Sequence, residues 1–302
     1  MSQAKPSSFY KYATASTGRI ILQSRSLRWS TPALFNDPYD TQFDLHVDGE
    51  IEEVRRLSLE KLWEAWYSEA PYIPHPGNIH GQLIAQFREK FPRMTREEFA
   101  AEMIPAIDEG FERATRALPS VHQEIRSLLA KSKILCQSSV WDSLPMWSYY
   151  ADNHRGVVLC FKVVPELDSP WEAARPVLYS DVMPRMGDVE FFSDLSAGLT
   201  SLDPKILVDR IVYTKAAEWA HEREWRLQAG SGRNPDAAFE DIPFHPLELD
   251  AVILGCAMLP DDRVHLIEIV NVLYPHARLL AACKHDREFR LTVENARQDP
   301  AR

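Results

Sequence analysis

A long block of helix-forming sequence interrupts a chain whose other segments are short and typical of strands. Between residues 50 and 132, apolar side chains recur at helical spacing, as Ile51, Val54 and Leu62 do at its start. We therefore expect one α+β domain over residues 1–302, in which residues 50–132 form a helical insertion that covers or lines a site.

Two patterns inside this block predict where helices begin. Thr95 with Glu98, and Ser120 with Gln123, have the spacing of a capping box, in which each side chain bonds the other residue's backbone N–H. Pro105 lacks an N–H and is expected to kink the helix that Thr95 opens. The sequence thus predicts separate helices after Thr95 and after Ser120.

The segments outside this block alternate irregularly between strands and helices. A regular alternation would predict a doubly wound parallel sheet, so the irregular order favours an α+β fold with a mixed, mostly antiparallel sheet. The segments with strand-type patterns are residues 9–12, 27–30, 133–139, 157–161, 177–179, 251–255, 277–283 and 289–293.

Charge and cysteine content exclude several classes of protein. The chain has 34 Lys and Arg against 44 Asp and Glu, a net charge of −10, which argues against bulk attraction to nucleic acid. Its 4 cysteines are scattered and have no zinc-type spacing. The first twelve residues lack the apolar core of a secretion signal, and the longest apolar run, residues 251–258, is too short to span a bilayer. We expect a cytoplasmic protein with no membrane partner, and the oligomeric state stays open.

The first candidate site segment is residues 145–161, where polar and aromatic residues directly precede a buried strand. Trp147 and Tyr150 suit the wall of a ligand cleft, and His154 is the segment's one acid–base candidate. His154 is equally explained as a structural hydrogen-bonding residue.

Two further segments concentrate charge. In residues 31–40, Asn36 and Asp37 precede a proline and are expected to form a turn that holds Asp37 near Asp40. In residues 218–230, a strand would place Glu222, Glu224 and Arg226 on one face. Such carboxylates either pair with the arginine or bind a ligand. We expect all three segments to converge on a single cleft.

Metal and nucleophile chemistry have weaker sequence support. A metal site could be assembled only from scattered residues: Asp37, Asp40, His154, Glu222 and Glu224. None of their spacings is a recognised ligand pair, so no metal ligand is predicted. The chain has no Gly-x-Ser-x-Gly motif and no glycine-rich phosphate loop.

Several motifs together resemble a bacterial family. FYKY, LRWSTPALFNDPYD, MWSYYADNHRGVVLCF, the W-x-x-E-x-E-W-R pattern and AVILG, in this order from Phe9 to Cys256, look like the bacterial domain of unknown function 2971. The resemblance implies a soluble bacterial protein of a family often found near mobile-element or defence genes, with no assigned activity.

A second resemblance, to ADP-ribosyltransferases, concerns the order of candidate residues. Lys11 with Tyr12, or Arg28, comes early, Ser138 lies mid-chain, and Glu222-x-Glu224 comes late. The resemblance implies that Glu224 stabilises an oxocarbenium-like transition state on NAD, that Glu222 orients the acceptor, and that Tyr149 or Trp147 stacks on nicotinamide. Lys11 departs from the family's Arg or His, and the serine pair lacks its threonine.

These considerations give one set of predicted site residues. The catalytic candidates are Glu224, Glu222 and His154. The candidates for binding a nucleotide cofactor such as NAD are Lys11, Tyr12, Arg28, Asn36, Asp37, Ser138, Trp147, Tyr150 and Arg226. A toxin-type or phage-defence transferase with a macromolecular acceptor is the function expected. The alternatives are a non-enzymatic sensor of a nucleotide or peptide, and a metal-dependent nuclease-like effector.

Overall fold

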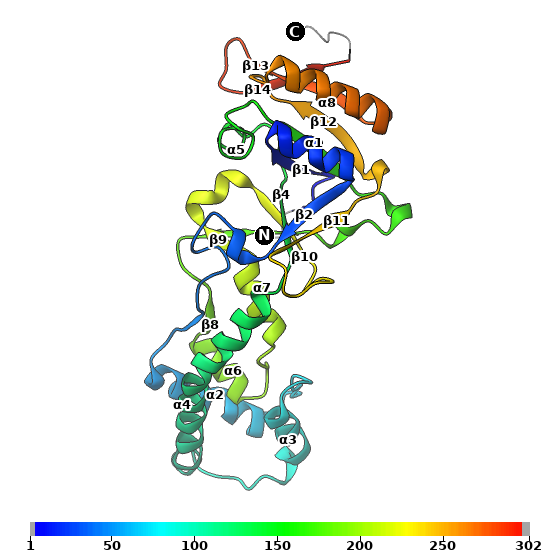
Figure 1. Ribbon diagram of the computed structural model, residues 1–302. Helices are drawn as coiled ribbons and strands as arrows, with labels where there is room; N and C mark the ends of the chain where they lie inside the picture. The colour runs from blue at the N-terminus through cyan, green and yellow to red at the C-terminus, as the bar shows by residue number, and fades with distance from the viewer. Residues whose placement is uncertain (1–3, 298–302) are drawn as a thin grey trace. The chain divides into compact units, whose positions relative to one another are not determined.

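The computed structural model describes residues 4–297, and its backbone contacts divide the chain into two compact units. The first unit contains the residues up to 41, residues 128–182 and the residues from 212 on; the second contains residues 42–127 and 183–211. Most of the segment expected as a helical insertion, residues 50–132, lies in the second unit together with a later stretch of chain. Figure 1 shows the helices and strands of both units.

The first unit is built around a mixed, mostly antiparallel sheet, which confirms the expected α+β class. Its strands pair in the order β11-β2-β4-β1-β5-β12-β13-β14, and β10 pairs with both β4 and β6. The strand bounds are β1 Ser8–Ala13, β2 Ser26–Ser30, β4 Ile134–Ser138, β5 Val157–Lys162, β6 Arg175–Pro176, β10 Glu224–Gln228, β11 Phe239–Pro243, β12 Leu249–Leu254, β13 Arg278–Lys284 and β14 Leu291–Asn295.

Alternation along β1 and β5 separates two apolar clusters, because successive side chains of a strand point to opposite faces. Phe9 pairs with Phe161 in the larger cluster, whereas Tyr12 pairs with Val158 in the smaller one. Helices α1 (Ala15–Ser24) and α8 (Pro260–Leu273) contact each other and contribute to the larger cluster. Helix α5 (Leu144–Tyr150) contributes to the smaller cluster.

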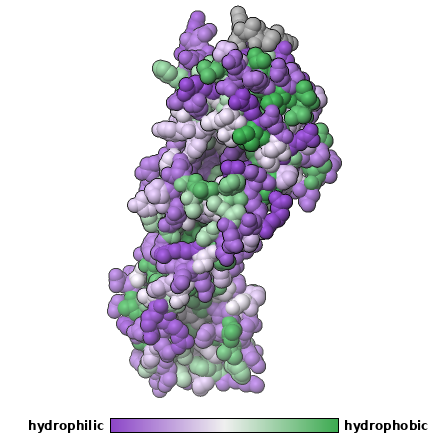
Figure 2. Space-filling model, in the orientation of Figure 1, coloured by the Kyte–Doolittle hydropathy of each residue, from purple (hydrophilic) through white to green (hydrophobic). Residues whose placement is uncertain are grey.

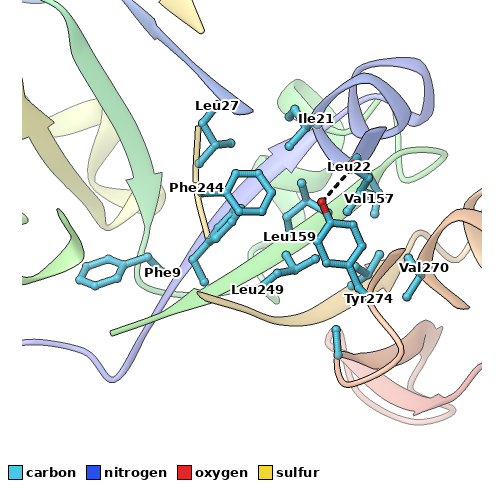
Figure 3. Packing of buried hydrophobic residues seen from close by; sticks show 14 of the residues in the cluster. Phe9, Ile21, Leu22, Leu27, Val157, Leu159, Phe244, Leu249, Val270 and Tyr274 are labelled. Atoms are coloured by element: carbon cyan, nitrogen blue, oxygen red, sulfur yellow. Dashed lines mark hydrogen bonds between the residues drawn. The ribbon is translucent and has the colours of Figure 1, made fainter. Parts of the chain in front are cut away.

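A hydrogen bond within the larger cluster links α1 to the residue that follows α8. The hydroxyl of Tyr274, just after α8, donates to the backbone oxygen of Leu22 in α1 at 2.7 Å (Figure 3). Phe244, Leu159 and Val270 surround this pair in the same cluster. The buried hydroxyl therefore keeps a partner within the apolar core, as buried polar groups require.

Gly156 allows β5 to begin directly beside β1. A Cβ at this position would lie 2.1 Å from the backbone oxygen of Ala13, so no larger residue fits without a backbone shift. The three residues Asp152, Asn153 and His154 precede it with φ values of 47°, 52° and 65°. Consecutive left-handed residues cannot continue a right-handed helix, so α5 stops at Tyr150, before this turn.

The first unit also contains a short pair of parallel strands. β7 (Leu178–Ser180) pairs with β9 (Thr214–Ala216). β9 is followed by the 3₁₀ segment η5 (Ala217–Glu222) and then by β10. This sequence of short elements brings Lys215, Glu222 and Glu224 to the same part of the unit.

The second unit is mainly helical. It contains α2 (Ile51–Tyr67), α3 (Ile79–Phe87), α6 (Val189–Ser196) and most of α4 (Arg96–Leu129) and α7 (Pro204–Val212), with the two-stranded pair β3 (His46–Val47) and β8 (Arg185–Gly187). α2 packs against α6. Lys61 of α2 adds ion pairs to Glu190 and Asp194 of α6.

One expected helix start in this unit is confirmed and the other is wrong. The backbone N–H of Thr95 donates to Glu98 Oε2 at 2.8 Å, and the N–H of Glu98 donates to Thr95 Oγ1 at 3.2 Å. No helix begins after Ser120, because α4 continues through Pro105 and Pro119. A proline removes only one hydrogen bond from a long helix, and packing of the apolar face outweighs that loss.

Candidate functional site

A cavity of about 270 Å³, lined by both polar and apolar side chains, lies within the first unit. It is lined by residues from all three segments expected to form a site, and by residues of β1, β2 and β4. The lining residues are Tyr10, Lys11, Tyr12, Arg28, Ser30, Leu34, Phe35, Asn36, Asp40, Ile134, Cys136, Gln137, Ser138, Met146, Tyr150, Lys215, Glu222 and Glu224.

The pairing of β4 explains why the sheet opens here. One edge of β4 pairs with β10 along its full length, from Ile134 to Ser138. The other edge is shared by two strands, each through a single residue pair: Ser30 of β2 with Ile134, and Tyr10 of β1 with Ser138. Between these pairs, Lys11 Nζ donates to the backbone oxygen of Cys136 at 3.0 Å. A side chain thus occupies the place of a neighbouring strand.

Five ionisable side chains form a buried group that we call the charged cluster: Asp40, Lys215, Glu222, Glu224 and Arg226. Each is less than 10% exposed, and Arg226 is fully buried. Three of them, Asp40, Glu222 and Glu224, bring carboxylates to the cavity wall. Buried carboxylates require charged or hydrogen-bonding partners, which the two cations supply.

Arg226 is the main partner of Glu224. Its Nε donates to Glu224 Oε1 at 2.8 Å, and its Nη2 contacts Glu224 Oε2 at 3.0 Å and Asp40 Oδ2 at 2.6 Å. Its Nη1 donates to the backbone oxygen of Val212 at 2.6 Å. The planar guanidinium therefore fixes two carboxylates from behind the cavity wall.

Lys215 joins the same carboxylates to Glu222. Its Nζ lies 2.6 Å from Glu222 Oε2, 3.3 Å from Glu224 Oε2 and 3.4 Å from Asp40 Oδ2. On its other side, Glu222 Oε1 accepts a hydrogen bond from the Tyr150 hydroxyl at 2.6 Å. Asn36 in turn donates to that hydroxyl oxygen at 3.0 Å. The chain from Asn36 to Glu222 links all three predicted segments.

The pKa values of the two glutamates in the cluster shift in opposite directions. Burial opposes ionisation of both. For Glu224, the Arg226 and Lys215 cations outweigh burial and lower its pKa to about 2. For Glu222, burial outweighs the attraction of Lys215, and the neighbouring Glu224 charge adds to it, so its pKa is raised. Glu224 therefore holds its negative charge more firmly than an ordinary carboxylate, whereas Glu222 takes up a proton more readily.

The pKa of Glu222 predicts how a Glu222→Gln variant responds to pH. Because the folded pKa exceeds the unfolded one, the stability that protonated Glu222 contributes is present at low pH and lost as pH rises through the folded pKa. Glutamine does not titrate, so the variant should gain stability relative to wild type over the range from about pH 4.3, the ordinary pKa of glutamate, upward. Urea unfolding of both proteins across this range measures the difference. If the stability of the variant relative to wild type instead decreased as pH rises, the result would show that Lys215 lowers the pKa of Glu222.

Four predicted binding residues line the cavity from the strands: Lys11, Tyr12, Arg28 and Ser138. Their polar groups already have protein partners. The Tyr12 hydroxyl donates to the Val140 oxygen at 3.0 Å, and Ser138 Oγ donates to the Glu222 oxygen at 2.7 Å. Arg28 pairs with Asp241 at 3.0 Å. The lysine ammonium, with three donors, keeps capacity for a ligand beyond its bond to Cys136.

The remaining predicted residues are not among the described residues that line the cavity. Trp147 is fully buried, and its Nε1 donates to the Trp141 oxygen at 2.7 Å. His154 stacks on the Trp147 ring with the centroids 6.1 Å apart, and burial lowers its pKa. Asp37 is buried, and its Oδ1 accepts from the Tyr39 N–H at 2.9 Å. Arg226 acts through Glu224 and Asp40. These four residues support the site or the core from outside the cavity.

The expected strand face of Glu222, Glu224 and Arg226 is partly wrong. β10 begins at Glu224, whereas Glu222 ends η5, and Arg223 between them has a left-handed φ of 45°. The turn at Arg223 replaces strand geometry at Glu222. The two carboxylates meet instead through Lys215, which contacts both.

Lys215 is the member of the charged cluster that sequence reasoning missed. It belongs to the three-residue strand β9 and has no charged neighbour within the preceding four residues. The uncharged residues Ile211 to Thr214 that precede it give no pattern that marks a site. Tyr179, whose hydroxyl accepts from the Glu224 N–H at 2.7 Å, was also missed.

Within residues 4–297, no group of three or more His, Cys, Asp or Glu side chains is arranged to hold a metal ion. In the same part of the chain, no helix combines the length and apolar composition that crossing a bilayer requires. On the face seen in Figure 2, hydrophilic residues predominate, with smaller hydrophobic groups between them. Comparison with protein-family models, curated proteins and solved structures gave no match.

Proposed function

We propose that the protein is an ADP-ribosyltransferase-like enzyme that uses NAD⁺ in this cavity. The observation that carries the proposal is strand register. Tyr10, which directly precedes the early candidates Lys11 and Tyr12 on β1, pairs with Ser138 of β4, and Ser138 pairs with Glu224 of β10. The early, middle and late motifs of the expected order therefore lie side by side, and all three line one cavity. Chain order alone does not require this adjacency.

The charged cluster suits cleavage of the bond between nicotinamide and ribose. In this step the electron pair of the N-glycosidic bond passes to the nicotinamide nitrogen, and positive charge develops on the ribose. With Glu222 ionised, three carboxylates face two cations, so the cluster has one net negative charge next to the cavity. A fixed charge in a buried setting stabilises the developing cation without reorganisation. The net charge depends on ionised Glu222, because Lys215 and Arg226 balance Glu224 and Asp40.

Glu222 is placed to manage the proton of the transfer. An acceptor hydroxyl forms a bond to the ribose carbon and releases its proton, which a carboxylate with a raised pKa can take. Tyr150 donates to this carboxylate at 2.6 Å and lines the cavity, so its hydroxyl offers a route to the acceptor. A macromolecular acceptor would make the enzyme an effector of the defence or toxin type.

The cavity is suited to one end of the dinucleotide. Its volume of about 270 Å³ lies just below the range of drug-sized ligand sites, roughly 300–1,000 Å³. Tyr12, Phe35 and Tyr150 offer aromatic faces at its wall, a role that buried Trp147 is not placed to take. Lys11 adds a cation at the wall, which suits the negative phosphates of the dinucleotide.

Release of nicotinamide from NAD⁺ tests the proposal. We expect release by the wild type, a loss of about 10²–10³-fold in Glu224→Gln, and a loss of about 10²-fold or more in Glu222→Gln. Glu218→Gln is a matched control, because Glu218 is exposed in the same segment and does not line the cavity. Release by wild type at the rate of buffer alone, with no effect of either cavity variant, would contradict the proposal.

One observation favours the non-enzymatic alternative, a nucleotide sensor. Both carboxylate oxygens of Glu222 and of Glu224 already accept hydrogen bonds within the protein. A site that only binds needs no free carboxylate. The two functions separate in one experiment: a sensor would show NAD⁺-dependent thermal stabilisation without release of nicotinamide.

A further inference from the structure

The second unit has a large apolar groove that is separate from the cavity described above. Its volume is about 960 Å³, and α2, α3, α4 and α6 supply most of its lining. Buried side chains such as Leu62, Ile84 and Ile107 form its floor. Every lining residue belongs to the second unit.

Helix α3 shows an apolar stripe in this groove. Ile79, Leu83 and Phe87 recur at a spacing of four residues, so they follow one side of the helix. They line the groove and remain 77%, 46% and 45% exposed. Large apolar side chains that stay exposed together mark interaction surfaces more often than scattered single ones do.

Helix α4 forms the opposite wall with small residues. Ala106, Gly110 and Ala114 recur every four residues along the groove. A Cβ built at Gly110 would meet no atom within 4 Å, so the space in front of it is open. Glycine in the middle of a helix is unfavourable. Here it leaves room for another chain to approach closely.

The charge of this unit indicates what kind of chain fits. Residues 42–127 and 183–211 contain 21 acidic and 13 basic residues, a net charge of −8, which leaves −2 for the rest of the chain. Glu102 and Glu109 flank the lining residues of α4, and Arg113 at the groove is paired with Glu109. Acidic surroundings favour a basic partner.

We propose that this groove binds a basic amphipathic helix of a partner protein, with the apolar face of that helix between α3 and α4. The lining of α4 extends from Met103 to Ala114, a length of about 17 Å at 1.5 Å per residue. A partner helix of about three turns would fill it, with apolar anchors at positions i, i+4 and i+7. Lysine or arginine on its outer flanks would lie near Glu102 and Glu109 of the acidic second unit.

Two synthetic 14-residue peptides test the proposal on the full chain at physiological ionic strength. Both carry leucine at one helical face; one has lysine and the other glutamate at the remaining positions. Fluorescence anisotropy should show saturable binding of the lysine peptide and at least tenfold weaker binding of the glutamate peptide. Equal binding of the two, or no binding of the lysine peptide, would overturn the proposal.

A pair of variants separates groove binding from general attraction to an acidic surface. Gly110→Leu fills the groove and should weaken binding of the lysine peptide at least tenfold. Leucine has a higher helix propensity than glycine, so α4 should still form. Ala101→Leu makes a comparable apolar change on the opposite side of α4 and should leave binding unchanged. Circular dichroism confirms that both variants fold. Unchanged binding of the lysine peptide to Gly110→Leu would show that the peptide binds outside the groove and would overturn the proposal. Binding of a fatty-acid probe, but not of the peptide, in the groove would also overturn it.

Discussion

Replacement of Arg226 by methionine is expected to lower the free energy of unfolding by about 3–5 kcal/mol, because it leaves two buried carboxylates without their main partner. Arg226 is fully buried and contacts both Glu224 and Asp40. Lys215 alone would then face three carboxylates. Chemical denaturation followed by circular dichroism measures the loss.

Two control variants test whether this loss of stability comes from the buried charged cluster. Arg28→Met removes an ion pair whose side chains are 55% and 46% exposed, and exposed pairs contribute about 0–1 kcal/mol. The double variant Arg226→Met with Glu224→Leu removes a cation and an anion together, so it should recover part of the lost stability. A loss in Arg226→Met no larger than that in Arg28→Met would contradict the assigned role of the charged cluster.

Trp147→Ala should destabilise the first unit by about 3–5 kcal/mol, the range for removing a large buried aromatic side chain. Trp147 is fully buried, stacks with His154 and contacts the Tyr12 ring edge at a centroid distance of 5.6 Å. Thermal and urea unfolding measure the effect. Tyr149→Ala on the same helix is the matched control, since Tyr149 is 70% exposed and should change stability by about 0.5 kcal/mol or less.

The same variants distinguish a core role for Trp147 from stacking on a ligand. Trp147→Phe keeps an aromatic ring in the core, so it should fold and release nicotinamide at a rate close to that of the wild type. If Trp147→Ala were as stable as wild type yet lost affinity for NAD⁺, the tryptophan would belong to the binding site. That result would contradict its placement in the smaller apolar cluster.

Local sequence patterns predicted most strands and the fold class, because strand segments such as residues 157–161 and 251–255 are continuously apolar. They did not predict the continuous α4, because the pattern at Ser120 is a valid helix start that packing overrides. They also did not predict that residues 183–211 share a unit with residues 42–127. Contacts between distant parts of a chain leave no local pattern.

The site was predictable where a residue's chemistry conflicts with its surroundings. Glu222 and Glu224 lie in an aromatic-rich segment, and such carboxylates need partners. Lys215 was not predictable, because a lone lysine in a short strand has no sequence signal. His154 was misleading: its polar neighbours suggested chemistry, whereas the left-handed turn at residues 152–154 places it against Trp147.

Binding of NAD⁺ to variants at the cavity mouth tests the central claim most directly. Leu34 lines the cavity and is 52% exposed, so Leu34→Trp should obstruct the cavity without disturbing the core. Leu259 is 54% exposed outside the cavity, which makes Leu259→Trp the matched control. Isothermal titration calorimetry should show NAD⁺ binding to wild type and Leu259→Trp, and at least tenfold weaker binding to Leu34→Trp. Equal affinity in all three proteins, or no binding to the wild type, would contradict the claim that this cavity is an NAD⁺ site.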